Sequence, residues 1–172
     1  MKQKISVRMI CQIAMLIALT IVVERLCSIN TPYVRIGFAF VPMVLCAALY
    51  GPVWGGIAYG LADIIGAVLF TGIFPGITIS RICSGVIFGL FLHAKNARFF
   101  PHVVLAAVLE EVVCALGLTT FFLALNSGTP FFGMLVTRLP QAGVMTVLML
   151  VVMPLMLKLG DTLRKHGFAP KR

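Results

Sequence analysis

Residues 9–23 read MICQIAMLIALTIVV, a stretch without a single charged side chain. A helix needs about 20 residues of this kind to cross the hydrocarbon core of a bilayer. Inside that core only helices and closed barrels satisfy their backbone hydrogen bonds, and this stretch lacks the alternating pattern of a barrel strand. We therefore expect a first transmembrane helix from about residue 7 to residue 28.

The rest of the chain repeats this pattern. Of its 172 residues, 60% are hydrophobic and only 11% are charged, whereas a soluble domain carries about 25% charged residues. We predict an all-α membrane protein that forms a single integral membrane domain over residues 1–172. Its second span is short, so we expect it to be tilted or sheltered by its neighbours. The six transmembrane helices are expected at about residues 7–28, 37–50, 53–70, 78–93, 102–125 and 131–159.

The positive charge of the chain has a topological explanation. Its net charge is +9, from 14 lysines and arginines against 5 acids. With both termini in the cytoplasm, ten of the fourteen basic residues fall in cytoplasmic segments, in agreement with the positive-inside rule. The charge then belongs to the lipid surface rather than to a nucleic-acid site. We expect a multi-pass protein of the bacterial plasma membrane with cytoplasmic N- and C-termini.

The other basic residues are all arginines in the outer half. Arg81 is about one turn inside the fourth span, and Arg138 is about two turns inside the sixth. Charges at that depth are costly unless they are paired or face a wet cavity, and a planar guanidinium suits carboxylates. The pattern favours a cavity for an anion that carries carboxylates. The alternative is that each arginine pairs with an internal acid such as Glu24 or Asp63. These outer arginines are Arg25, Arg35, Arg81 and Arg138.

Asp63 lies in the middle of the third span and shares a helical face with Gly56, Gly60 and Ala67. Small residues on that face let another helix or a flat ligand approach closely. A carboxylate inside a membrane is a functional hypothesis by default, and it can accept two hydrogen bonds from the N–H edge of an amino-heterocycle. The alternative is a structural ion pair with an arginine.

Several further side chains are candidates for the same cavity. Hydroxyl and amide groups in the fourth and sixth spans can bind a ligand, although hydrogen bonding between helices is their commoner use. Aromatic rings in the outer connections can stack on a ring of the ligand, or belong to the interfacial aromatic belt. The polar candidates are Thr78, Ser80, Ser84, Thr137 and Gln141, and the aromatic ones are Tyr33, Phe74 and Phe131.

Glu110 and Glu111 are adjacent in the middle of the fifth span. Neighbouring residues of an α-helix point about 100° apart, so both cannot face one ligand equally. We expect at least one of them to bond a neighbouring helix. An intramembrane enzyme that uses these acids or Asp63 is one alternative function, and a structural adaptor is another.

Motifs for other chemistry are missing from the chain. It has no G-x-x-x-x-G-K-[ST] loop, so it cannot energise transport with ATP by itself. It also lacks H-E-x-x-H, a nucleophile elbow and paired metal ligands. We therefore expect neither an enzyme nor a bound cofactor or metal.

The order and spacing of several short motifs resemble a known family. They extend over about residues 10–155 and are VRIGFAFVP at 34–42, LYGP at 49–52, GLADIIG at 60–66, FPGITIS at 74–80, GVIFGL at 85–90, GTPF at 128–131 and Arg138-Leu139. Together they are similar to the folate family of substrate-binding subunits of energy-coupling factor (ECF) transporters.

This resemblance implies a six-helix protein that captures a vitamin from outside. It would then work with a membrane coupling subunit and two ATPases, and topple in the membrane to release the vitamin inward. The pair Ala14 and Ala18 on the first helix looks like the family's contact for the coupling subunit. The loop around Pro32 is our candidate gate over the ligand.

Folate or a folate derivative fits these residues, with a flat pteridine for Asp63 and the aromatic rings and a glutamate tail for the arginines. Arg81 and Thr119 depart from the family pattern, which has a small residue and an asparagine at these places. Another vitamin or precursor, such as pantothenate or a queuosine precursor, therefore stays open. The predicted substrate-binding residues are Tyr33, Arg35, Asp63, Phe74, Thr78, Ser80, Arg81, Arg138 and Gln141.

Overall fold

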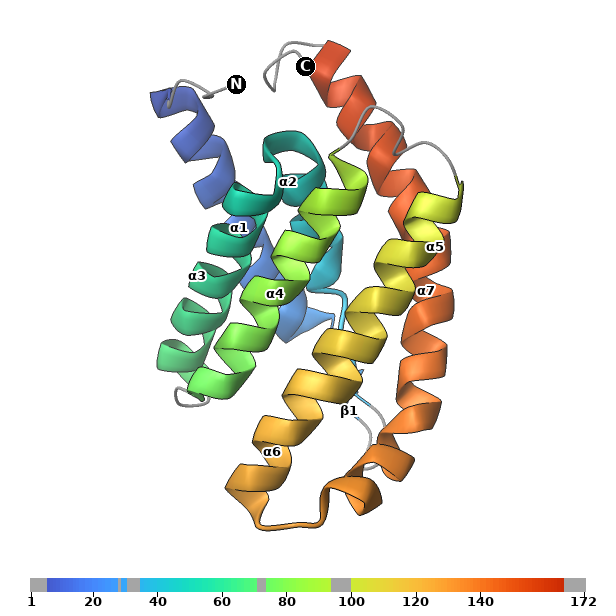
Figure 1. Ribbon diagram of the computed structural model, residues 1–172. Coiled ribbons are helices and arrows are strands. Elements are labelled where there is room, and N and C mark those ends of the chain that lie inside the picture. Colours follow the sequence, from blue (N-terminus) through green and yellow to red (C-terminus); the bar gives the residue numbers. More distant parts are fainter. Residues whose placement is uncertain (1–5, 28, 31–34, 71–73, 94–99, 166–172) are drawn as a thin grey trace.

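The computed structural model describes residues 6–27, 29–30, 35–70, 74–93 and 100–165. These form a bundle of helices, with one short antiparallel pair of strands between the first two helices (Figure 1). The segments α5, η1 and α6 follow one another without a break. The helices are α1 (Val7–Leu26), α2 (Phe40–Tyr50), α3 (Pro52–Phe70), α4 (Pro75–Leu92), α5 (Phe100–Leu109), the π-helix η1 (Glu110–Thr119), α6 (Thr120–Ser127) and α7 (Phe131–Lys165), and the strands are β1 (Ile29–Asn30) and β2 (Arg35–Ile36).

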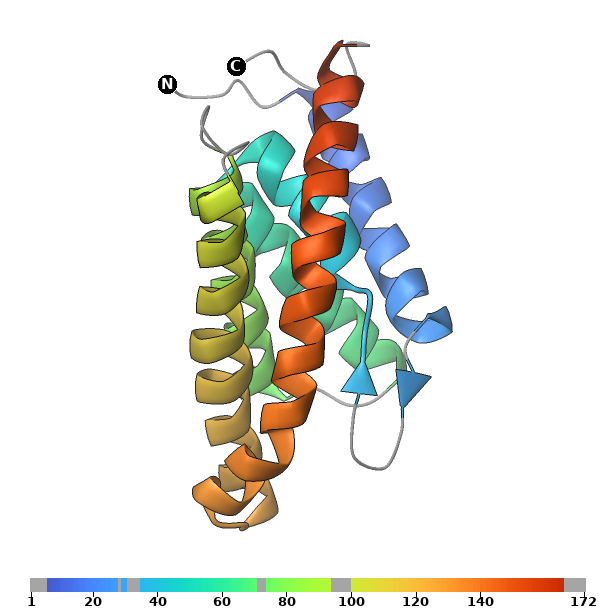
Figure 2. The ribbon, with the colours of Figure 1, turned by 90° about the vertical axis from the view of Figure 1, so that its right-hand side faces the viewer.

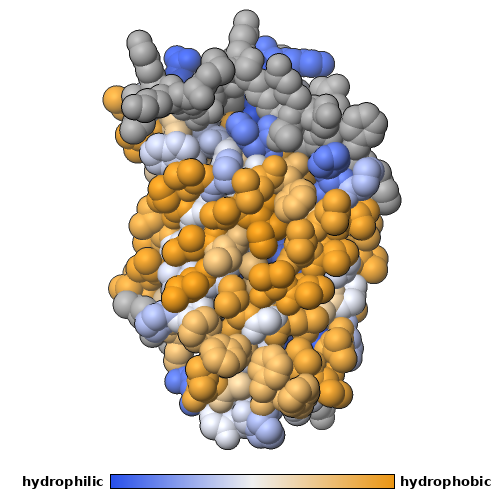
Figure 3. Space-filling model, viewed as in Figure 1, coloured by the Kyte–Doolittle hydropathy of each residue, from blue (hydrophilic) through white to orange (hydrophobic). Residues whose placement is uncertain are grey.

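The transmembrane pattern predicted from hydropathy is confirmed in the described residues. Five helical stretches are long and apolar enough to cross a membrane, and α2 is a shorter apolar helix. Hydrophobic side chains cover the middle of the face seen in Figure 3. The start of α1 and the end of α7 lie at the same end of the bundle, which we call the terminal end (Figures 1 and 2). The α6–α7 connection lies at the opposite end, the hairpin end.

The short helix α2 is enclosed by the bundle, as its length predicted. Its 11 residues extend over about 16 Å, about half of a hydrocarbon core of ~30 Å. All of them except Val41 are buried, and α2 contacts α1, α3, α4 and α7. Because lipid does not surround it, α2 has no need to reach across the membrane.

The C-terminal end of α2 is capped by side chains from distant parts of the chain. Arg164 of α7 donates from Nη2 to the carbonyl oxygens of Ala48 at 2.7 Å and Leu49 at 3.0 Å. The Nδ1 atom of His93, just after α4, lies 3.0 Å from the Ala48 oxygen. The last carbonyls of a helix have no partner within it, so these contacts fix the end of α2 inside the bundle.

Helices α3 and α4 are in backbone contact. A Cβ atom added at Gly85 would lie 2.4 Å from the Gly55 oxygen, and one at Gly89 would lie 2.2 Å from Pro52 Cα. On the predicted small-residue face of α3, a Cβ at Gly60 would lie 2.6 Å from the Ile82 side chain of α4. This face therefore receives a helix, one of the two possibilities that the sequence left open.

The contact predicts opposite effects for two glycine-to-alanine changes. Gly89→Ala should lower the melting temperature of the detergent-purified protein, because overpacking against backbone destabilises by about 1–3 kcal/mol. The matched control is Gly66→Ala in α3, where a Cβ has open space and helix propensity improves by up to ~1 kcal/mol. Equal melting temperatures for the two variants would contradict the close contact.

Candidate functional site

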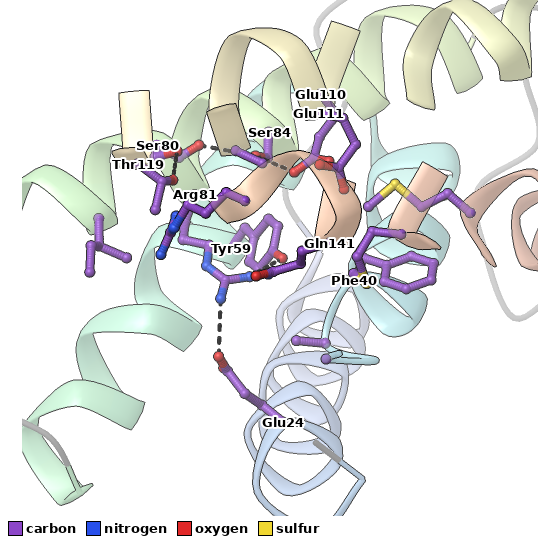
Figure 4. A pocket seen from close by; sticks show the side chains of 17 residues that line it. Glu24, Phe40, Tyr59, Ser80, Arg81, Ser84, Glu110, Glu111, Thr119 and Gln141 are labelled. Carbon is purple, nitrogen blue, oxygen red and sulfur yellow. Dashed lines mark hydrogen bonds and ion pairs between the residues drawn. The ribbon is translucent and has the colours of Figure 1, made fainter. Parts of the chain in front are cut away.

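A cavity opens within the bundle and receives side chains or backbone from all six described spans (Figure 4). Its cavity volume is about 180 Å³, which is smaller than the roughly 300–1,000 Å³ of typical small-molecule sites. Phe40, Met145 and Met149 supply apolar surface. The polar residues that line it are Glu24, Tyr59, Ser80, Arg81, Ser84, Glu110, Glu111, Thr119, Arg138 and Gln141.

Arg81 is the centre of the polar network on one wall of this cavity. Its Nη2 atom lies 3.1 Å from Glu24 Oε1 of α1, and its Nε atom lies 3.8 Å from Asp63 Oδ1 of α3. Its Nη1 atom donates to the hydroxyl of Tyr59, also on α3. For Arg81 the alternative of pairing with internal acids is therefore correct. One guanidinium serves two carboxylates and joins three helices.

Asp63 and Thr78 contact this network on the side of Arg81 away from the cavity lining. Thr78 Oγ1 donates to Asp63 Oδ2 at 2.8 Å, and Asp63 in turn faces Arg81. Among the described residues, the two lie outside the lining of the cavity. In this structure Asp63 contacts Thr78 and Arg81 of α4, and its expected contact with a ligand stays a prediction.

Ser80 and Thr119 connect α4 to the π-helix at the cavity wall. Ser80 Oγ donates to the Cys114 carbonyl at 2.9 Å and lies 2.7 Å from Thr119 Oγ1. Since the Ser80 hydrogen serves the carbonyl, Thr119 donates to Ser80. The two positions that depart from the family pattern, Arg81 and Thr119, both line the cavity, so they are suited to affect which ligand it accepts.

Glu110 and Glu111 begin η1 and both line the cavity, with exposed fractions of 8% and 5%. Ser84 Oγ donates to Glu110 Oε1 at 3.0 Å, which confirms the expected bond to a neighbouring helix. Although neighbouring residues of an α-helix point about 100° apart, both acids line the same cavity (Figure 4). The i→i+5 pattern of a π-helix changes the angle between neighbouring side chains, and π-helical segments are frequent at functional sites. No sequence pattern predicted this π-helical segment.

The remaining predicted residues are distributed as follows. Arg138 and Gln141 line the cavity on either side of Pro140 in α7. Phe74 lies in a separate hollow between the start of α4 and α6, and Thr137 donates to the Met134 carbonyl of its own helix. The side chain of Arg35, all of Tyr33 and the loop around Pro32 lie outside the described residues.

Two further observations concern the other predicted contacts. Arg25 donates to the Gly66 carbonyl at 3.2 Å and lies over the Phe70 ring, at 4.3 Å from its centroid. Ala14 and Ala18 are exposed on α1. In the described ranges, no three histidine, cysteine, aspartate or glutamate residues form a group that could hold a metal ion.

Comparison with known families identifies the class of protein. A family model described as the substrate-specific component of ECF transporters matches residues 8–157. The chain belongs to this family. The ECF substrate-specific components are parts of transporters rather than enzymes, and the apolar helices make this member a multi-pass membrane protein.

Two curated relatives are both named folate transporter FolT. The one from Clostridium novyi (strain NT) is 33% identical over 142 residues, which are 81% of this chain and 82% of the relative. The one from Leuconostoc mesenteroides subsp. mesenteroides is 32% identical over 126 residues, 71% of this chain and 66% of the relative.

Solved ECF substrate-specific components have the same fold. A crystal structure of FolT bound with folic acid is 30% identical with a TM-score of 0.82, over 90% of this chain and 98% of that one. The substrate-specific component for biotin from an ECF-type transporter is 19% identical with a TM-score of 0.69, over 96% and 95%. At this identity the biotin component shows the fold alone.

The Arg81 network predicts that the effect of Glu24→Gln on the melting temperature changes sign when Arg81 is also replaced. Arg81→Met leaves Glu24 and Asp63 without their shared counter-charge and should destabilise the protein by about 3 kcal/mol. Glu24→Gln should lower the melting temperature of the wild type but raise it in the Arg81→Met background, because it then removes a repulsion. An equal loss in both backgrounds would show that the ion pair is unimportant.

Proposed function

We propose that this chain is the folate-binding subunit of an ECF-type ABC vitamin importer in the bacterial plasma membrane. It captures folate from outside and releases it inward together with a coupling subunit and two ATPases. The FolT relatives and the FolT structure with folic acid support the choice of folate. The observation that carries the proposal is one cavity, lined by six spans, with charged side chains in its lining. This constellation serves binding and not catalysis.

The cavity walls match the chemistry of folate, which has a flat heterocycle at one end and two carboxylates at the other. On α7, Arg138 and the amide of Gln141 supply hydrogen-bond donors for the carboxylates of folate. Ser80 and Arg81 line the same cavity from α4. Asp63 and Thr78 act as positioning residues, since they hold Arg81 in place. Arg35, Tyr33 and Phe74 remain predictions from the sequence.

The membrane orientation follows from charge. We place both termini in the cytoplasm, so that the hairpin end faces outside. Arg138 is seven residues from the start of α7, about 10 Å along the helix. Folate then enters from the hairpin end, with its carboxylates meeting Arg138 near the mouth.

Binding and side-chain role can be tested together by calorimetry on the purified protein. Folic acid should bind, whereas biotin, pantothenate, thiamine and riboflavin should not. Arg138→Ala should weaken folic acid binding by about 10- to 100-fold, because a hydrogen bond to a charged group contributes about 1.5–3 kcal/mol. Folded wild-type protein that binds no folate would contradict the choice of folate as the ligand.

Arg25→Ala is the matched control for Arg138→Ala. It removes an arginine at the same end of the bundle, but one that bonds Gly66 and stacks on Phe70. Its affinity for folic acid should stay within about threefold of the wild type. If both variants lose affinity equally, the effect is general electrostatics and not a contact of Arg138.

The coupling subunit is expected to bind the exposed face of α1 that carries Ala14 and Ala18. A tryptophan in place of either alanine fills the space into which a partner helix would pack. Ala14→Trp and Ala18→Trp should abolish co-purification with the coupling subunit and leave folate binding unchanged. Val151→Trp, at an exposed site on α7, is the control. Normal co-purification of both alanine variants would exclude this face.

A further inference from the structure

The separate hollow between the start of α4 and α6 lies near the hairpin end of the bundle (Figure 1). We call it the α4–α6 hollow, and its volume is about 370 Å³. Its apolar lining includes Phe74 and Ile77 on the α4 side and Phe122 and Leu125 on the α6 side, and Asn126 supplies a polar group. It is a second site of binding size, apart from the charged cavity.

The α4–α6 hollow has a packed floor and an open rim. Phe122 lies directly over Gly76 of α4, where an added Cβ would be 2.2 Å from the ring. Gly76, Ile77 and Phe122 are half-buried, whereas Phe74 and Leu125 at the rim are 42% and 66% exposed. The rim therefore faces the surroundings of the bundle, and around the apolar helices of a multi-pass membrane protein these are lipid.

The polarity of the hollow changes along α6. Asn126 follows Phe122 by four residues, so both side chains lie on one face of the helix. The continuous helix Pro101–Ser127 has 27 residues, about 40 Å, which exceeds a hydrocarbon core of ~30 Å. Its last turn, with Asn126, therefore reaches the level of the lipid head groups. The hollow is polar at that level and apolar below it, as a phospholipid is.

We propose that the α4–α6 hollow binds one acyl chain of a phospholipid from the leaflet at the hairpin end. The chain packs between Phe122 and Ile77, and the head group lies beside Asn126. A partner helix, about 10 Å across, is too wide for a hollow of this volume, whereas a flexible chain gains contacts on both sides. Ile77 also lines the charged cavity, so the bound chain packs against a residue of the cavity wall.

Bromine quenching of tryptophan fluorescence tests the site in the detergent-purified protein. Trp54 is the one tryptophan of the chain, and Trp54→Phe removes its signal. In that background Leu125→Trp reports from the rim of the hollow. A phosphatidylcholine brominated on one chain should quench half of this signal at about one lipid per protein. Addition of the same lipid without bromine should restore the fluorescence.

Phe132→Trp in the Trp54→Phe background is the matched control. Phe132 is 77% exposed at the start of α7, also close to the hairpin, but it does not line the hollow. Its half-quenching should need at least about tenfold more lipid, because it meets only boundary lipid. Equal lipid requirements of the two reporters would show boundary lipid alone and overturn the site.

Thermal unfolding gives a second test without a reporter. A small molar excess of phosphatidylcholine should raise the melting temperature of the wild type by about 2–4 °C, since a ligand of the folded state stabilises it. Leu123→Trp places a larger ring in the hollow and should remove this shift. Phe121→Trp, two residues away and outside the lining, should keep it. A wild type without the shift, or folded Leu123→Trp that retains it, contradicts the lipid site.

Discussion

The guanidinium of Arg81 is the charge around which the binding cavity is organised. At membrane depth a bare charge is costly, and the structure meets this constraint by bringing Glu24 from α1 and Tyr59 and Asp63 from α3 to the same group on α4. The glycine contact between α3 and α4 makes this possible, because only a close approach brings Tyr59 and Arg81 within hydrogen-bond distance. Packing and electrostatics therefore fix one wall together.

The spans could be predicted because hydropathy reports how each stretch partitions into lipid, and even the enclosure of α2 followed from its length. The position of a residue along its span could also be predicted, so Arg81 and Arg138 were recognised as cavity candidates. The rotation of each helix about its own axis could not be predicted from the sequence. Whether Asp63 faces the cavity or Thr78 depends on how α3 and α4 pack, and Tyr59, a group in the Arg81 network, carries no charge that would single it out.

The acid pair shows a second limit of sequence reasoning. Neighbouring residues of an α-helix point about 100° apart, yet Glu110 and Glu111, which begin the π-helix Glu110–Thr119, both line the cavity. No motif marks this segment in the sequence, and π-helical segments are rare. The two acids were therefore visible in the sequence, whereas their shared place in the cavity wall appears only in the three-dimensional structure.

The cavity opens at the start of α2, a helix that is too short to cross the membrane. Near the terminal end, the Tyr50 hydroxyl donates to Gln12 Oε1 of α1, and the Ala48 carbonyl accepts from Arg164. At its other end α2 begins at Phe40, which lines the cavity. An ordinary span would need about nine more residues to complete the crossing. Because Gly37, Ala39 and Phe40 line the cavity, the cavity opens where α2 begins, and a ligand held there packs against the start of this short helix. Occupied and empty states therefore differ in how completely the interior of the bundle is packed.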